Sequence, residues 1–219
     1  MSVVQTPRDM GRVSVRSTFI PAVVAVVACS GLGMMSDANA NPRSTFPGRR
    51  VGGGSRGECS ARTLVHLVPE TSVYAPDASG LVGLLQGPSN SPVSLQVTLK
   101  PEDGSAASTE MLAAGPASVV LFDMQAKRPV VWESSFSCGS REDQDSSDPL
   151  AFVQSTSPPA LSLLVSDPEP SDQSLQSLLT ALRAKCGTSV STVETMVQFG
   201  LSDLATNDWP QKLPIRCEF

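Results

Sequence analysis

The chain has 219 residues, of which 40% are hydrophobic, 17% charged and 5% aromatic, and it carries a formal net charge of −5. This composition is typical of one modest globular unit. A single histidine excludes metal sites built from several histidines, and the acidic balance argues against a general nucleic-acid-binding protein.

The first 40 residues have the pattern of a signal peptide. Three arginines between residues 8 and 16 precede a mostly apolar stretch at 19–35, which is followed by the small-x-small sequence Ala-Asn-Ala at 38–40. The stretch is too short and too interrupted to favour a permanent membrane span. The pattern therefore predicts export of the chain, with cleavage before residue 41.

A second pattern in the same segment leaves an alternative open. The sequence Val-Val-Ala-Cys at 26–29 is also typical of a lipoprotein box, in which Cys29 is acylated and becomes the first residue of the mature chain. No other apolar run approaches the length of a membrane helix. The first pattern predicts a periplasmic or extracellular protein, and the second predicts a protein anchored to a membrane by lipidated Cys29.

Residues 41–60 are rich in arginine and glycine, which predicts a flexible arm. Residues 41–62 carry five arginines against one glutamate, a net charge of +4, whereas the chain from residue 63 onward carries 8 basic and 18 acidic residues. Such an arm either lies on its own acidic body or stays solvated, or it binds an anionic partner such as an envelope protein, a polysaccharide or lipid headgroups. The residues that would bind this partner are Arg43, Arg49, Arg50, Arg56 and Arg62.

The glycines of this arm also match two sequence motifs, one of dinucleotide-binding proteins and one of enzymes with a serine nucleophile. Residues 52–57 fit G-x-G-x-x-G, and residues 53–57 fit G-x-S-x-G around Ser55. A dinucleotide fingerprint must follow a buried strand and open a helix, and a nucleophile elbow needs the same context. Because a β-like run follows these glycines instead, both matches are interpreted as results of glycine density, and no cofactor is expected.

Residues 61–168 have the pattern of a β domain, with short apolar runs separated by Gly, Pro, Asn and Asp. The clearest strand is 93–100, where apolar and polar residues alternate. Further strands are predicted at 63–68, 81–86, 118–122, 129–133, 150–154 and 161–165. Seven short strands predict a β-sandwich, immunoglobulin-like, or a small barrel, with Trp132 in its core.

The only histidine, His66, falls within the strand predicted at 63–68, on the same face as Leu64 and Val68. This position favours a hydrogen-bonded, half-buried strand histidine. The partners of a catalytic triad are near in space rather than in sequence, so the spacing of residues does not exclude His66 as a general base. A periplasmic hydrolase using His66 is therefore the alternative function.

Residues 169–219 predict a pair of helices packed on the β domain. Four leucines recur at helical spacing between residues 175 and 182, after a candidate N-cap at Ser171. Asp172 in the first turn and two basic residues in the last turn complement the helix dipole. These signals agree on a first helix.

A second apolar stripe at helical spacing runs from residue 193 to residue 204. Ser191 and Glu194 form a candidate capping box at its start. Pro210 and Pro214 then end the helical pattern, so the tail is expected to be attached to the domain by Cys217.

The mature chain keeps four of the five cysteines, an even number that in an oxidising compartment predicts two disulfides. Four cysteines allow three pairings, and position favours Cys59 with Cys138 and Cys186 with Cys217. No two of them are close enough for a zinc site, and the acidic run 141–148 lacks the glycine and the final glutamate of an EF-hand loop. No metal is expected.

Three pieces of the chain carry a resemblance to a known family. They are the opening GRRVGGGSRGEC at 48–59, the sequence LVPE at 67–70, and VWE at 131–133 leading to Cys138. In this order they resemble a cyanobacterial family of exported proteins of unknown function, whose opening reads GRRxGGG[ST]RGxC. The resemblance covers about residues 48–165, although residues 81–92 lack the aromatic-rich strand of that family. It implies export and a β-rich fold, and it implies no activity and no catalytic residues.

Taken together, these patterns predict an exported, disulfide-linked, mainly β domain with a C-terminal helical pair. No segment combines a nucleophile, an activated base and an orienting partner in a recognisable context. The predicted function is therefore non-catalytic, that of a binding or envelope-associated protein.

Overall fold

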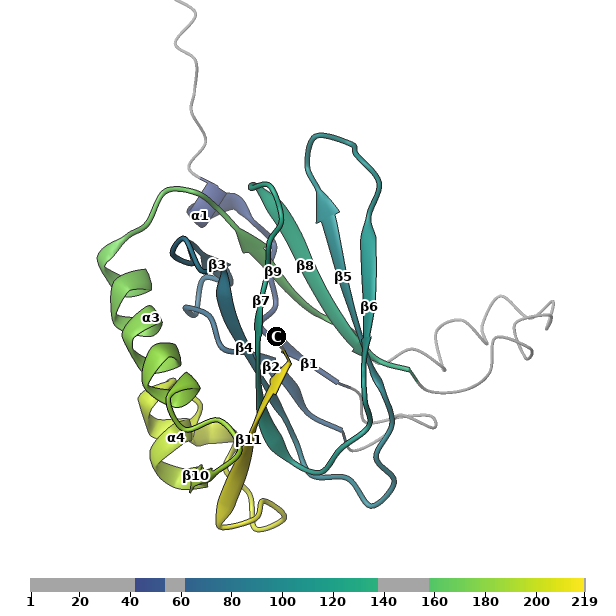
Figure 1. The fold of residues 1–219 in the computed structure, drawn as a ribbon, viewed down its shortest axis with the longest axis vertical. Coiled ribbons are helices and arrows are strands. Elements are labelled where there is room, and N and C mark those ends of the chain that lie inside the picture. Colours follow the sequence, from purple (N-terminus) through teal and green to yellow (C-terminus); the bar gives the residue numbers. More distant parts are fainter. Residues whose placement is uncertain (1–41, 54–61, 138–157, 219) are drawn as a thin grey trace, which may run out of the picture. The chain divides into compact units, whose positions relative to one another are not determined.

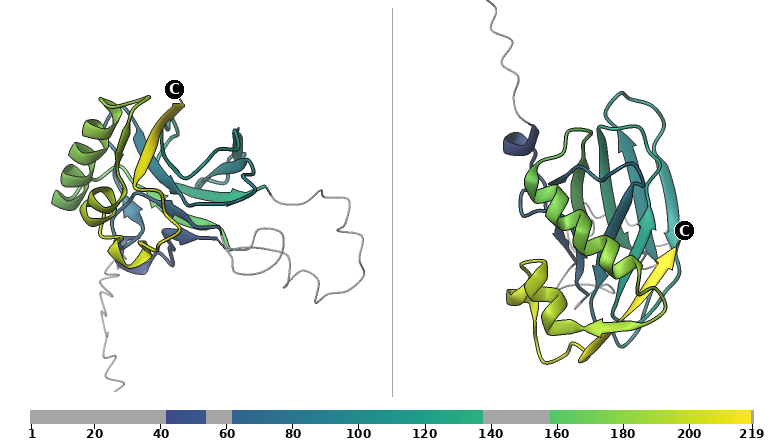
Figure 2. Two further views of the ribbon diagram at one scale, coloured as in Figure 1. Left: turned by 90° about the horizontal axis from the view of Figure 1, so that it is seen from below. Right: turned by 60° about the vertical axis from the view of Figure 1, so that its left-hand side comes forward.

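The computed structural model describes residues 42–53, 62–137 and 158–218. Two β-sheets lie against each other, and helices cover the outer side of one of them (Figure 1, Figure 2). The predicted mainly β fold with helices near the C-terminus is confirmed. The signal peptide predicted at 1–40, the strand predicted at 150–154, and Cys59 and Cys138 lie outside the described residues.

The larger sheet has six strands, and its centre is fully buried. Strands β4 (Leu81–Gln86) and β7 (Ser118–Asp123) pair antiparallel, with Gly83 opposite Leu121. The C-terminal strand β11 (Lys212–Glu218) pairs parallel to β7, with Ile215 opposite Val119. In spatial order the strands are β1 (Val51–Gly52), β2 (Leu64–His66), β4 (Leu81–Gln86), β7 (Ser118–Asp123), β11 (Lys212–Glu218) and β10 (Ser189–Ser191).

The second sheet has five strands and presents Trp132 to the first sheet. In spatial order they are β3 (Val73–Tyr74), β9 (Ala160–Leu164), β8 (Val130–Phe136), β5 (Leu95–Pro101) and β6 (Ser108–Leu112). The strand predictions that fall on described residues are confirmed, with ends that differ by at most three residues. The edge strand β6 was not predicted because four of its five residues are exposed, which removes the alternation that marks a strand.

Three helices of the described chain lie outside the sheets: α1 (Pro42–Thr45), α3 (Pro170–Arg183) and α4 (Thr192–Gln198). The N-cap of α3 is Glu169 and not Ser171, because Pro170 takes the first helical position and the Asp172 carboxylate accepts the backbone N–H of Glu169 at 2.8 Å. The predicted N-cap of α4 is confirmed, since the Ser191 hydroxyl accepts the N–H of Glu194.

Helix α4 is shorter than its apolar stripe predicts. It ends at Gln198, and Gly200 follows with a φ of +63°, a conformation that favours glycine and does not continue a helix. A short 3₁₀ turn, η2 (Ser202–Leu204), takes up the rest of the stripe.

The prediction that residues 169–219 are only a helical segment is incomplete. Residues 212–218 form β11, which lies between β7 and β10 inside the larger sheet. Alternating Leu213 and Ile215 are buried there, and the pairing with β7 begins at Ile215, just after Pro214. The missing N–H of Pro214 therefore interrupts no pairing with β7.

The core has two layers, one between the sheets and one beneath α3. Leu175, Leu179 and Leu182 of α3 are buried against the outer face of the larger sheet. A Cβ atom added to Gly83 would lie 2.9 Å from Cδ2 of Leu179, so a larger residue here would require the leucine side chains packed over β4 to shift.

Candidate functional site

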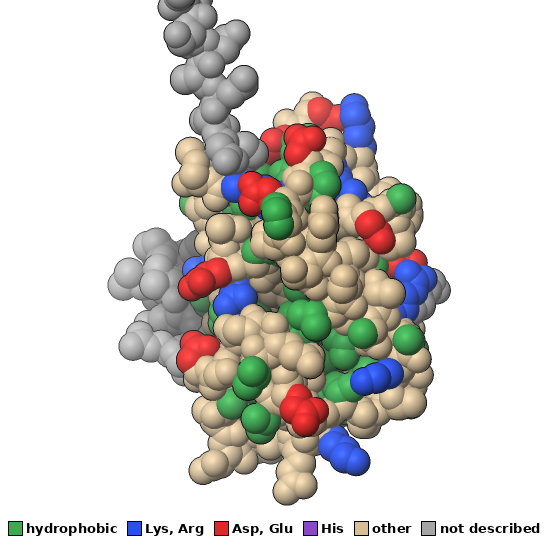
Figure 3. Space-filling view, turned by 90° about the vertical axis from the view of Figure 1, so that its left-hand side faces the viewer, with side chains coloured by type: hydrophobic (Ala, Val, Ile, Leu, Met, Phe, Trp, Pro, Cys, Tyr) green, Lys and Arg blue, Asp and Glu red, His purple; other side chains and the backbone are tan. Residues whose placement is uncertain are grey.

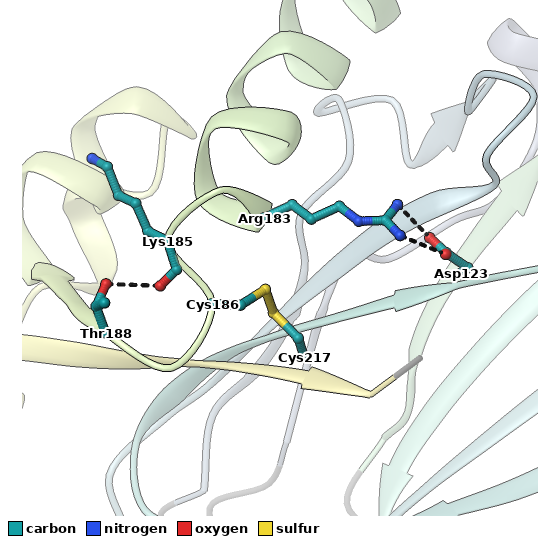
Figure 4. The surroundings of a disulfide bond; sticks show 6 residues. All are labelled: Asp123, Arg183, Lys185, Cys186, Thr188 and Cys217. Atoms are coloured by element: carbon teal, nitrogen blue, oxygen red, sulfur yellow. Dashed lines mark hydrogen bonds and ion pairs between the residues drawn. A yellow bond between two sulfur atoms is a disulfide. The ribbon is translucent and has the colours of Figure 1, made fainter.

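A disulfide joins Cys186, just after α3, to Cys217 in β11, with 5.9 Å between their Cα atoms (Figure 4). This part of the predicted pairing is confirmed. Nearby, both guanidinium Nη atoms of Arg183 donate to the carboxylate of Asp123 at 3.1 and 3.0 Å. The crosslink and this ion pair attach the end of α3 to two neighbouring strands, β11 and β7.

His66 lies in the core between the sheets and not at the surface. Its side chain is fully buried, its Nδ1 is 2.8 Å from the hydroxyl of Ser162 in β9, and its ring stacks on Trp132 in β8 with centroids 3.5 Å apart. The Trp132 indole N–H donates to the Ser134 hydroxyl at 2.8 Å. The prediction of a hydrogen-bonded strand histidine is confirmed, but the residue is buried completely and not by half.

Burial lowers the pKa of His66 well below its ordinary value, because a charged imidazole would lose its hydration there. Its Nε2 atom meets no hydrogen-bond partner among the described residues. His66 lines none of the three described cavities. A neutral, enclosed imidazole of this kind has no access to a substrate, so its position gives no support to a role as general base.

The described arginines of the predicted arm contact the domain itself. Arg43 forms ion pairs with Asp172 and Glu169, at 2.6 and 3.1 Å. The other three donate to backbone carbonyls: Arg49 to Pro159, Arg50 to Val68, Phe199 and Gly200, and Arg62 to Ser91. Residues 42–53 form α1 and β1, so this part of the predicted arm is structured and contacts the domain. Arg56 lies outside the described residues.

The face that carries α3 and α4 shows acidic and basic side chains dispersed among uncharged ones (Figure 3). The visible part of this face offers no patch of a single charge sign. Two valines of α4, Val193 and Val197, are 64% and 60% exposed. Among the described residues no group of three or more His, Cys, Asp or Glu side chains could hold a metal ion, and no helix is long and apolar enough to cross a membrane.

Several cavities open on the surface, and three of those lined by described residues are considered in turn. One of about 600 Å³ lies between the ends of β5, β6 and β7, and one of about 380 Å³ lies between α3, α4 and the segment after β2. The third, of about 440 Å³, lies between the segment after β3, the segment before α3, the first half of α3 and Arg128. This third cavity, called the Arg128 cavity below, combines apolar walls with polar side chains, of which Asp172 is buried and Arg128 and Gln176 are half-buried.

The wall of the Arg128 cavity is connected to the core through Tyr74, the only tyrosine of the chain. Its fully buried side chain donates its hydroxyl to Oε1 of Gln176 in α3. Burial, and then the charges of Asp77 and Asp172, raise the pKa of Tyr74 above its ordinary value, while Arg128 acts in the opposite direction. The hydroxyl therefore stays protonated at neutral pH and remains a donor toward Gln176.

Sequence patterns did not identify the residues of this cavity as a site. Arg128 and Gln176 line it from the segment before β8 and from α3, Tyr74 of β3 lies behind Gln176, and about fifty residues separate each from the next along the chain. Among the cavity residues only Asp172 belongs to a recognisable sequence pattern, as an acid in the first turn of the helix. No family model, curated protein or solved structure matches the chain, so its own geometry is the basis for assigning a function.

Proposed function

We propose that this chain is an exported, non-catalytic binding domain that works in an oxidising compartment outside the cytoplasm. The observation that carries the proposal is the disulfide between Cys186 and Cys217. Such crosslinks form and persist in secreted and periplasmic proteins, whereas cytosolic thiols are kept reduced. The leader-like pattern of residues 1–40 points to the same compartment.

The non-catalytic part of the proposal is supported by the position of His66. A hydrolase of the alternative kind needs this single histidine as an accessible base, but the ring is enclosed between Ser162 and Trp132 in the core. The Arg128 cavity offers polar groups that can hold a ligand. A binding role therefore uses the groups that are accessible, whereas hydrolysis would require one that is not.

The test is the intact mass of the chain expressed with its native leader in a bacterial host, taken from soluble and membrane fractions. Each sample is alkylated before and after reduction. We expect a soluble species that begins at residue 41 and whose thiols react only after reduction. A heavier membrane species that begins at an acylated Cys29 would instead favour the lipid-anchored alternative, and the variant Cys29→Ser is its control because it removes the acylation site.

Two outcomes would contradict the proposal. One is a chain that keeps residues 1–40 and has reactive thiols at Cys186 and Cys217. The other is turnover of a panel of esters, glycosides or peptides that is lost in His66→Ala, provided that the variant stays folded. A resemblance to the cyanobacterial exported family remains a prediction, and a leader cleaved at residue 41 is the outcome that agrees with it.

A further inference from the structure

We propose that the outer edge of β6 binds an extended segment of another protein as an additional β-strand, with a basic side chain of that segment opposite Glu110. This inference rests on the proposed function, since it names the kind of partner that the binding domain takes. Strand β6 is the last strand of the second sheet, and no strand of the described residues pairs with its other edge (Figure 1).

The backbone of β6 is regular and available for pairing on this edge. It pairs with β5 through five consecutive residues, from Leu99 opposite Ser108 to Leu95 opposite Leu112. In an antiparallel pair alternate residues direct their N–H and C=O groups to opposite sides, so some of these groups in β6 point away from β5. Residues 108–111 are exposed, and β6 has no proline or lysine, the residues that commonly protect such an edge. The edge therefore offers the backbone groups that strand addition uses.

The two faces of β6 give an added strand something to contact. Glu110 lies opposite Val97 of β5 and shares its face, because paired residues of antiparallel strands point to the same side of a sheet. Both residues line the cavity of about 600 Å³, as does Phe122 of β7, so this face is turned toward the larger sheet. Met111 lies on the opposite face and is 51% exposed. A strand added beside β6 would place alternate side chains over the cavity and the others beside Met111.

Glu110 determines the charge of the partner. Its side chain is exposed, and no lysine or arginine of the described residues forms an ion pair with it. The other charged residues that line the cavity have partners: Asp123 is paired with Arg183 at 3.0 Å. Lys127 is paired with Asp103 at 3.5 Å. Since opposite charges on directly opposite strand residues attract, a lysine or arginine of the added strand fits beside Glu110.

A second copy of this chain is a poorer partner for the same edge. Antiparallel pairing of β6 with its own copy over all five residues is centred on Glu110, with Ser108 opposite Leu112. The two Glu110 carboxylates would then lie directly opposite each other on one face, which is destabilising. The favoured partner is therefore a different chain, with a basic residue and apolar residues at alternate positions of an extended segment.

The test is an amide ¹H–¹⁵N NMR titration of the full chain in its oxidised form with three capped seven-residue peptides. The lysine peptide has valine at its second and sixth positions, lysine at its fourth and threonine elsewhere. The glutamate peptide has glutamate in place of the lysine. The third is the lysine peptide with N-methyl groups on the lysine and on the next residue, which removes one amide donor from each edge of the strand.

The lysine peptide should cause saturable shifts at residues 108–112, with a dissociation constant in the millimolar range. The glutamate peptide should bind about fivefold more weakly, because it places a like charge opposite Glu110, and the N-methylated peptide should not bind. Absence of saturable shifts at residues 108–112 with the lysine peptide, or equal binding of the N-methylated peptide, would overturn the proposal.

Matched variants separate pairing at β6 from a general charge effect. Glu110→Lys should reverse the preference, so that the variant binds the glutamate peptide about fivefold more tightly than the lysine peptide. Glu194→Lys makes the same change at an exposed position of α4, outside the other sheet, and should keep the preference of the parent chain. A preference for the lysine peptide that persists in Glu110→Lys would refute the pairing with Glu110.

Each variant is compared with the parent by the amide spectrum away from β6, which reports whether it is folded. Glu110→Gln provides the test if Glu110→Lys does not fold; it should bind the two charged peptides equally, and an unchanged preference would refute the assignment. Shifts at residues 108–112 that depend on protein concentration without peptide would overturn the choice of a different chain as partner.

Failure of this inference and failure of the proposed function have different signatures. An exported, disulfide-bonded chain that does not bind the lysine peptide would contradict only this inference. A reduced chain retained in the cytoplasm would contradict the proposed function, whatever the titration shows.

Discussion

The stability of the fold should depend on pH through His66, because this is the only histidine and it is buried in its neutral form. In the folded state its pKa lies well below the ordinary value near 6.5, and the cause is loss of hydration. In the unfolded chain the imidazole titrates at its ordinary pKa. Below pH 6.5 the unfolded state therefore takes up a proton that the folded state refuses, and stability falls as the pH falls.

The size of this effect follows from linkage. Each pH unit between the unfolded and the folded pKa lowers the free energy of unfolding by about 1.4 kcal/mol. Between pH 7.5 and pH 5.5 we therefore expect a loss of about 1.4 kcal/mol from His66 alone.

The assay is urea unfolding followed by tryptophan fluorescence at four or five pH values between 7.5 and 5.5. The variant His66→Asn removes the titrating ring and keeps a polar atom near Ser162, so it should lack the loss of stability in this window. Ser162→Ala is the matched control, since it removes the hydrogen-bond partner at 2.8 Å but keeps the histidine and hence most of the pH dependence.

Two results would refute this reasoning. One is a loss of the same size in His66→Asn as in the parent chain. The other is an imidazole resonance that titrates near pH 6.5 in the folded protein, which would mean that the ring reaches water without unfolding. Either result would place His66 in a hydrated environment and would reopen the possibility that it acts as a base.

Three further perturbations test the packing by urea unfolding. Replacing Cys186 and Cys217 by serine should lower the free energy of unfolding by about 3 to 4 kcal/mol, because the crosslink spans 31 residues and restricts the unfolded chain; an unchanged midpoint would contradict this. Gly83→Ala should cost about 1 to 3 kcal/mol, because its Cβ would approach α3 to 2.9 Å, and a stabilised variant would disprove that contact. Arg43→Met should cost about 3 kcal/mol by leaving the buried Asp172 charge unpaired, and adding Asp172→Asn should restore part of it.

Local patterns in the sequence determined the parts of this fold that depend on neighbours along the chain. Apolar runs bounded by turn residues placed β4 and β7 within one residue, and leucines at helical spacing placed α3. The positions of the cysteines favoured the pairing of Cys186 with Cys217 among three possible pairings, and the structure decided it. These signals act over short distances because the periods of a helix and a strand are local properties.

Only the tertiary structure decided how distant segments meet. The alternation that identifies a strand is absent from β6, which lies at an exposed edge. Strand β11 contains Pro214, which excludes a helix but does not prevent pairing with β7 from Ile215 onward. The Arg128 cavity is lined by Arg128 and Gln176 together with the segment after β3, and these parts meet only when α3 packs beside β3 and the segment before β8. Sequence separation hides such a site, because a lone tyrosine, arginine or glutamine has no pattern until the fold removes its water and its alternative partners.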